Sequence, residues 1–234
     1  MSLPIIALDF ETKTKALQFL HEFPKDEHLF VKIGMELFYQ TGPSIISEIS
    51  SLGHDIFLDL KLHDIPNTVQ RAMHIIAEMG NIKLTTIHAA GGSHMIAAAR
   101  AGLDTTASGQ KIQLLAITQL TSTAQTQLNE EQKIPGSIRD SVLNYAKLAQ
   151  NNGANGVVAS GLEVHDIKQA TDSKFLCVTP GIRLQAGPDK DQTRVVTPET
   201  ARQNGSDFIV VGRPITQAVD HVAAYQEIKK RWQG

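Results

Sequence analysis

Short apolar segments alternate along the chain with longer stretches in which apolar residues return every three or four positions. The apolar segments begin near Pro4, Leu29, Asp55, Leu84, Ile112, Gly156, Phe175 and Phe208. The stretches between them include residues 37–52, 68–79, 93–101, 138–150 and 215–232, whose spacing predicts helices. Glycines stand where these helices should end: Gly53, Gly80, Gly102, Gly153 and Gly205. The pattern therefore predicts strand and helix alternating along the whole chain.

Eight apolar segments in 234 residues indicate an α/β protein of a particular kind. A doubly wound parallel sheet also alternates strands and helices, but eight units favour closure into a (β/α)8 TIM barrel. We predict that residues 1–234 form one such barrel domain.

The amino-acid composition argues against several classes of function. The chain is 41% apolar, 20% charged and 5% aromatic with a net charge of −2, which is ordinary for a globular protein and gives no sign of nucleic-acid binding. It contains no apolar run long enough to cross a bilayer, and its first residues lack the features of a signal peptide. The single cysteine, Cys177, lies in an apolar segment and predicts a buried thiol. We expect a cytoplasmic protein without nucleic-acid or membrane partners.

The predicted strands end in polar residues. Barrel enzymes carry their chemistry at the carboxyl ends of the strands. Read in order, these ends hold Asp9, Lys32, Asp59 with Lys61, His88, residues 118–121, Ser160, residues 179–181, and Gly212 with Arg213. A barrel built only for stability has no need of so many charges around one mouth.

The third strand carries the strongest signal, the segment Asp-Leu-Lys-Leu-His-Asp-Ile-Pro-Asn-Thr at residues 59–68. Because side chains alternate along a strand, Asp59 and Lys61 should face the same side as Phe57. Asp64 offers a second carboxylate to the same lysine, and two such neighbours favour its protonated form. A structural cluster of ion pairs is the alternative interpretation of this motif.

Two later segments favour an anion site. Residues 179–183 and 210–215 each contain a glycine followed by an arginine, after the seventh and eighth predicted strands. Barrels often bind phosphate with these two loops. Two long connections, residues 119–137 and 185–194, leave the same face and are interpreted as lid segments, with tolerated insertions as the alternative.

These segments together resemble the orotidine 5'-monophosphate decarboxylase family. The resemblance rests on residues 59–68 and extends to residues 7–9, 31–34, 179–183 and 210–215, in the family's order from one end of the chain to the other. It implies decarboxylation of orotidine 5'-monophosphate to uridine 5'-monophosphate, the last step of de novo pyrimidine synthesis. It also implies that neither a metal nor an organic cofactor takes part.

The resemblance assigns roles residue by residue. Lys32, Asp59, Lys61 and Asp64 match the catalytic charged tetrad, with Lys61 as the proton donor. Substrate contacts are implied for Asp9, Lys32, Thr68, Thr121, Pro180, Arg183, Gln192, Gly212 and Arg213. Asp9 and Lys32 would bind the ribose, Thr121 the pyrimidine, and Arg183, Gln192, Gly212 and Arg213 the phosphate. In the family Asp64 and Thr68 reach the neighbouring subunit's site, which implies a homodimer.

Two alternatives stay open at this level. A sister sugar-phosphate enzyme of the hexulose-phosphate synthase type shares the Asp-x-Lys-x-x-Asp pattern but uses Mg²⁺, which prefers carboxylate oxygens. Such enzymes usually have glutamate where this chain has Lys32, and a lysine there would repel the metal. The other alternative, an inactive barrel used as a scaffold, finds no support because no tetrad position is substituted.

Overall fold

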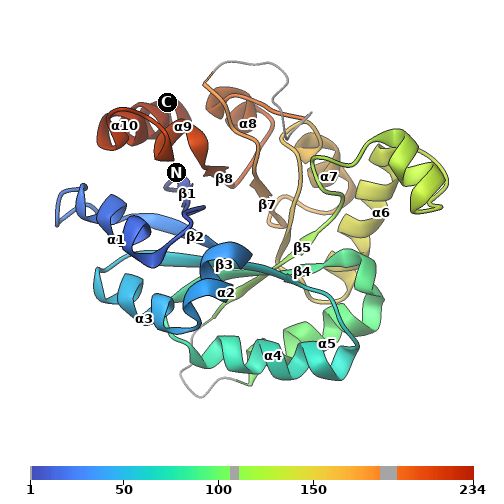
Figure 1. Cartoon of the computed structure of the whole chain (residues 1–234). Coiled ribbons are helices and arrows are strands. Elements are labelled where there is room, and N and C mark those ends of the chain that lie inside the picture. Colours follow the sequence, from blue (N-terminus) through green and yellow to red (C-terminus); the bar gives the residue numbers. More distant parts are fainter. Residues whose placement is uncertain (1, 106–110, 185–193) are drawn as a thin grey trace.

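Eight parallel strands close into a barrel in the computed structural model, which describes residues 2–105, 111–184 and 194–234 (Figure 1). Each strand pairs with the next along the chain, and the last pairs with the first. The strands are β1 (Ile5–Ala7), β2 (Phe30–Gly34), β3 (Asp55–Leu62), β4 (Ile82–His88), β5 (Gln113–Ile117), β6 (Gly156–Val158), β7 (Leu176–Thr179) and β8 (Phe208–Val211). The predicted (β/α)8 barrel is confirmed.

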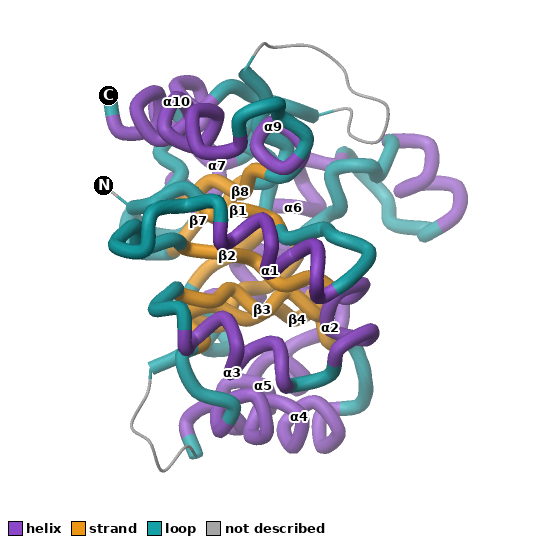
Figure 2. Tube along the Cα trace, turned by 60° about the vertical axis from the view of Figure 1, so that its left-hand side comes forward, coloured by secondary structure: helices purple, strands orange, loops and turns teal. Residues whose placement is uncertain are grey.

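Helices connect successive strands and surround the barrel, as the tube in Figure 2 shows. The first half of the chain contributes α1 (Lys13–His21), α2 (Met35–Thr41), α3 (Ser44–Ser51), α4 (Pro66–Glu78), the short 3-10 turn η1 (Ala89–Gly91) and α5 (Gly92–Asp104). The second half contributes a π-helical turn, η2 (Gln127–Glu131), then α6 (Ile138–Asn151), α7 (Val164–Ala170), α8 (Pro198–Gln203), α9 (Arg213–Thr216) and α10 (His221–Gln233).

Two of the predicted helices are each divided in the structure. The helix expected over residues 37–52 is broken between α2 and α3, where Gly42 has a φ of 65° and Pro43 lacks an N–H to donate. The helix expected over residues 215–232 is broken between α9 and α10, where Asp220 caps α10 by accepting a hydrogen bond from the Ala223 N–H at 2.9 Å. Apolar spacing continues across both breaks, so periodicity alone predicted single helices wrongly.

Apolar residues form two separate cores because strand side chains alternate between the two faces of the barrel wall. The larger core lies between the strands and the helices and includes Ile56, Leu58 and Leu60 of β3. The smaller core fills the barrel itself and consists of Ile5, Ala7, Phe30, Phe57, Leu84, Leu115, Val178 and Val210. This inner core supports the side chains at the mouth of the barrel.

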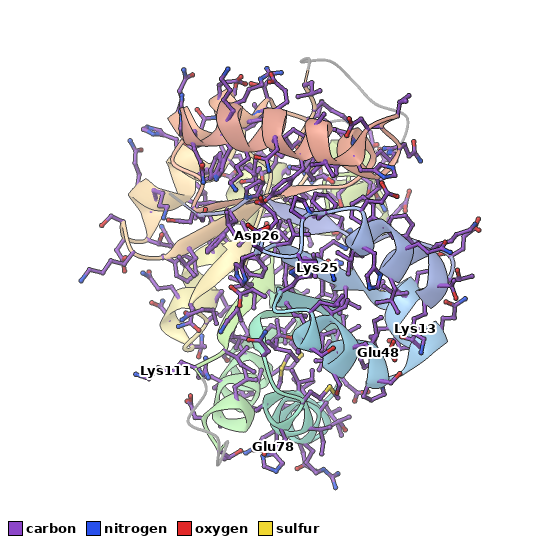
Figure 3. The ribbon with its side chains drawn as sticks, turned by 90° about the vertical axis from the view of Figure 1, so that its left-hand side faces the viewer. Lys13, Lys25, Asp26, Glu48, Glu78 and Lys111 are labelled. Atoms are coloured by element: carbon purple, nitrogen blue, oxygen red, sulfur yellow. The ribbon has the colours of Figure 1, made fainter. Side chains whose placement is uncertain are left out.

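The two ends of the described chain meet on one side of the barrel. The indole Nε1 of Trp232 donates a hydrogen bond to the carbonyl of Ser2 at 3.0 Å. Elsewhere on the outer shell, Lys13 of α1 and Glu48 of α3 lie side by side and form an ion pair at 2.9 Å (Figure 3). Among the residues described, none of the helices is both long enough and apolar enough to span a membrane.

Candidate active site

A cavity of about 570 Å³ opens at the carboxyl ends of the strands. Its floor includes Ala7, Phe57 and Val210 of the inner core. The predicted site residues that line it are Asp9, Lys32, Asp59, Lys61, Thr121, Pro180, Arg183, Gly212 and Arg213. Segments far apart in the sequence therefore meet at one mouth.

Four of these side chains form a row of alternating charge. Lys32 Nζ lies 3.2 Å from Asp9 Oδ1 and 3.7 Å from Asp59 Oδ2. Lys61 Nζ lies 2.8 Å from the same Asp59 oxygen. The Asp59 side chain is only 10% exposed and the Lys61 side chain 25% exposed, so water screens this pair weakly.

Alternation along β2 and β3 places these charges inside. Phe30 and Phe57 belong to the inner core, and Lys32 and Asp59 follow them by two residues on the same faces. Lys61 continues this series on β3, as predicted, although its backbone has left regular strand geometry with a φ of 53°. The left-handed region is unfavourable for a lysine, so the surrounding contacts must hold it there.

Asp59 is a buried carboxylate whose partners compensate for its burial. Burial by itself raises the pKa of Asp59, but the charges of Lys32 and Lys61 and hydrogen bonds from Lys61 and Thr86 bring that pKa below its ordinary value. The carboxylate is therefore ionised at neutral pH and can hold both ammonium groups.

The far side of the cavity is formed by the loops after β7 and β8. Gly181 adopts a φ of 76°, which a residue with a side chain rarely does, and Arg183 follows it. Gly212 precedes α9, which begins at Arg213. Both arginines line the cavity. The two glycine–arginine loops therefore lie at one place, as predicted.

Two predicted residues, Asp64 and Thr68, do not line the cavity, and a third is not among the described residues. Asp64 and Thr68 are exposed, and Asp64 Oδ1 accepts a hydrogen bond from the Ile65 N–H at 2.6 Å. In the described parts of this single chain no ion pair joins Asp64 to Lys61, so the expectation that Asp64 offers this lysine a second carboxylate stays a prediction. Strand β3 ends at Leu62 and the chain turns outward before Asp64. Gln192, with residues 185–193, lies outside the described residues.

Sequence reasoning missed several polar residues of the site. Ser122 and Gln217 line the cavity from loops, where no periodicity signals their direction. Gln119, which belongs to the polar strand end at residues 118–121 but was given no role, also lines the cavity, and its amide donates a hydrogen bond to Ser141 on α6 at 3.0 Å. Thr86 lies beneath the charged row and could have been found from its position two residues before the end of β4, on the inward face.

Two histidines and the cysteine stand outside the charged row. The rings of His63 and His88 lie 5.5 Å apart, and neither lines the cavity. Burial, with the charges of His63 and Lys61, lowers the pKa of His88. Cys177 is buried in β7 as predicted, and burial raises the pKa of its thiol to about 12, which makes it a poor nucleophile. Among the residues described, no three His, Cys, Asp or Glu side chains gather as metal ligands.

A buried ion pair connects two loops at the rim. Arg194 pairs with Glu163, which precedes α7, and also donates a hydrogen bond to the carbonyl of Leu120 at 2.7 Å. Glu163 Oε2 accepts a hydrogen bond from the Ser160 N–H at 2.9 Å. Burial raises the pKa of Glu163, and Arg194 and the Ser160 N–H act against that shift.

Fold and site together define a (β/α)8-barrel enzyme with charged groups at the carboxyl ends of its strands. The chain belongs to the orotidine 5'-phosphate decarboxylase / HUMPS family, whose model matches residues 2–228.

Named relatives agree with this assignment over nearly the whole chain. An orotidine 5'-phosphate decarboxylase of Enterococcus faecalis is 53% identical over 231 residues, which cover 98% of this chain and 97% of the relative. One of Streptococcus thermophilus is 52% identical over 229 residues, covering 98% of this chain and 96% of the relative. The crystal structure of orotidine 5'-phosphate decarboxylase from Lactobacillus acidophilus is 42% identical, covers 100% of both chains and gives a TM-score of 0.89.

Proposed function

We propose that this protein decarboxylates orotidine 5'-monophosphate to uridine 5'-monophosphate, the final step of de novo pyrimidine synthesis, and that Lys61 performs the chemistry. One observation carries the mechanism: the Lys61 ammonium is held 2.8 Å from a buried carboxylate in the same cavity as two glycine–arginine loops. Membership of the family and the named relatives support the substrate. The single cysteine and the reaction suit the cytoplasm, where we place the protein.

The reaction needs a cation at one carbon atom. When the bond from C6 to the carboxyl carbon breaks, CO2 leaves and the electron pair stays on C6 in the plane of the ring, with no adjacent π-system to accept it. An ammonium beside C6 stabilises this charge as it develops, which lowers the barrier more than it stabilises the bound substrate. Lys61 then donates a proton to C6, which gives the product, and regains a proton from water.

Asp59 holds the Lys61 ammonium in place at 2.8 Å, and Lys32 holds Asp59 from the other side at 3.7 Å. Repulsion between Asp59 and the substrate carboxylate would act on the ground state, whereas the lysine acts on charge that develops in the transition state. We therefore assign the larger effect to the lysine.

The remaining cavity residues are assigned to binding. Arg183, Arg213 and the backbone of Gly212 would bind the phosphate, since arginines and close backbone N–H groups suit a dianion. Pro180 belongs to the first of these loops and lines the same cavity, so it is also assigned to substrate binding. The predicted roles of Asp9 and Lys32 toward the ribose, Thr121 toward the pyrimidine and Gln192 toward the phosphate stay part of this proposal.

We also propose a homodimer in which Asp64 and Thr68 complete the partner's site. Both residues are exposed, and Ile65 between them is 66% exposed. Nearby α2, which follows the strand paired with β3, exposes Met35 at 44% and Tyr39 at 72%. Large apolar side chains of this kind next to site residues favour a protein interface over a solvated face.

Loss of orotidine 5'-monophosphate absorbance with purified, EDTA-treated protein tests the function. We expect full turnover without added metal. Activity that disappears with EDTA and returns with Mg²⁺ would instead support the sister sugar-phosphate chemistry, although a divalent cation beside Asp59 would meet the Lys32 ammonium. Tight binding of the nucleotide without turnover would support a scaffold role.

A further inference from the structure

Thr86 of β4 connects two functional parts of β3 through one hydroxyl group. The residue is 0% exposed and points into the barrel beneath the charged row. Its Oγ1 donates a hydrogen bond to Asp59 Oδ1 at 2.9 Å and accepts one from the backbone N–H of Lys61, also at 2.9 Å. A hydroxyl can donate one hydrogen bond and accept others, so both contacts form together.

The contact to Lys61 compensates for an interruption in the hydrogen bonding of the sheet. Leu58 pairs with Thr85 and Leu62 with Ile87, so three residues of β3 stand opposite Thr86 alone. Such a bulge breaks the ladder of backbone hydrogen bonds and redirects a side chain. Here the Thr86 hydroxyl takes the place of a strand carbonyl for the Lys61 N–H, at the residue whose φ is 53°.

The contact to Asp59 determines how its carboxylate is turned. Oδ1 is bound to Thr86, which leaves Oδ2 facing Lys61 at 2.8 Å and Lys32 at 3.7 Å. Without the hydroxyl, the Oδ1 atom would lack its donor in a buried setting, and the carboxylate could rotate between the two ammonium groups.

We propose that Thr86 is a positioning residue for decarboxylation: its hydroxyl fixes the Asp59 carboxylate and the bulged backbone of Lys61 relative to each other, so that the ammonium stands at one defined place. Thr86 does not line the cavity and acts only through these two residues. The proposal rests on the proposed role of Lys61 in catalysis.

Thr86→Val tests it, because valine keeps the shape and removes only the hydroxyl. We expect kcat to fall by about 10- to 100-fold, the effect of losing a hydrogen bond to a charged catalytic group. KM and the affinity for uridine 5'-monophosphate should change by less than about threefold, since the assigned binding groups are untouched. Thr86→Ser, which restores the hydroxyl, should recover kcat to within about threefold of the original protein.

Thr85→Val is a matched control one residue away. Thr85 is also 0% exposed but lies on the opposite face of β4, and its hydroxyl bonds to no residue that the structure describes. The same substitution there removes an unpaired buried polar atom, so kcat should be unchanged and the melting temperature equal or higher.

Hydrogen exchange gives a readout that is independent of turnover. The Lys61 amide should exchange faster in Thr86→Val than in the original protein, and at an unchanged rate in Thr85→Val. If Thr86→Val does not fold, Thr86→Ala serves in its place for every measurement.

The outcomes separate this proposal from the proposed function. A kcat for Thr86→Val like that of Thr85→Val, an equal loss in Thr86→Ser, or unchanged exchange of the Lys61 amide would overturn the positioning role. Absence of orotidine 5'-monophosphate turnover by the original protein would defeat the proposed function, while the exchange measurement would still decide whether Thr86 holds Lys61.

Discussion

Lys61 has an unfavourable backbone conformation, and its charged side chain lies in an unfavourable environment. Its φ of 53° is sterically disfavoured for a lysine, and its charged side chain is only 25% exposed. A conformation of this kind persists only where neighbouring contacts impose it, and such residues cluster at functional sites. The contacts with Asp59 and Thr86 provide that constraint.

Lys61→Ala should reduce kcat by about 10⁴-fold or more, because it removes both the stabilising charge and the proton donor. Affinity for uridine 5'-monophosphate should stay within about tenfold, since the assigned phosphate loops are intact. Single-turnover kinetics and calorimetry measure the two quantities. The control Lys83→Ala removes a half-exposed lysine from the opposite end of the barrel and should leave kcat and the affinity unchanged. Near-normal turnover by Lys61→Ala would refute the catalytic role of Lys61.

Arg213→Ala should act mainly on binding. Loss of a charge-assisted contact to the phosphate should raise KM by about 10- to 100-fold, with a smaller effect on kcat. Arg139→Ala removes an exposed arginine paired with Asp166 and should leave KM unchanged. Steady-state kinetics of both variants measures KM and kcat. An unaltered KM in Arg213→Ala would mean that the phosphate binds elsewhere.

At the scale of elements, the Glu163–Arg194 pair joins the turn after β6 to the loop after β7, and Arg194 also reaches the loop after β5. Arg194 donates to Leu120, which precedes the predicted pyrimidine contact Thr121 and lines the same cavity. Both side chains of the pair are at most 16% exposed. Breaking a buried pair leaves one charge uncompensated, which is more harmful than removing both.

Arg194→Gln should lower the free energy of unfolding at pH 8 by about 3 kcal/mol, because Glu163 remains as an unpaired buried carboxylate. Arg194 opposes the burial-induced rise in the pKa of Glu163, so its loss raises that pKa further. Deprotonation of Glu163 then costs folding free energy, so the deficit should be greatest well above the folded-state pKa and should shrink as the pH falls below it, where Glu163 is protonated in the folded protein.

Urea denaturation across this pH range measures the effect, with the double variant Glu163→Gln and Arg194→Gln as the control. Its stability should show no such pH dependence relative to the original protein. A deficit in Arg194→Gln that is the same at pH 8 and at pH 5 would mean that the pair is not electrostatically important.

Element boundaries were predicted well where a strand or helix is one uninterrupted run. The strand at residue 55 and the helix from residue 138 begin where the pattern placed them. The breaks at Pro43 and Asp220 were missed because apolar spacing reports which face is buried, and two successive helices can bury the same side. Backbone signals, a proline without an N–H and a capping aspartate, carry that information instead.

At the scale of the whole molecule, the alternation of side chains along the strands and the fold class predicted which charged residues meet at the mouth of the barrel. Asp59 and Lys61 follow directly from the period of a strand, and Asp9, Lys32 and Arg213 follow from closure of the barrel. Asp64 could not be placed in this way because it lies beyond the end of β3, where no period applies. Its proposed role depends on a second subunit.

Mixing two inactive variants tests that dimer. Lys61→Ala and Asp64→Ala should each be nearly inactive alone. If Asp64 acts across the interface, each mixed dimer has one site free of both changes, and random mixing should restore about a quarter of the sites. Co-expression followed by assay measures this, with Lys61→Ala co-expressed with Asp59→Ala as the control that cannot complement. Absence of recovery in a confirmed mixed dimer would show that Asp64 serves its own subunit.

Cys177 of β7 is buried in the core between the strands and the helices, so its thiol can report when that packing opens. A thiol that is 0% exposed with a pKa of about 12 reacts with an alkylating reagent only when β7 and the helices that cover it separate. Since Cys177 lies two residues before the end of β7, its labelling rate should slow when a nucleotide occupies the adjoining loop. Ligand occupancy can thus be followed through a chemical label, without an introduced probe.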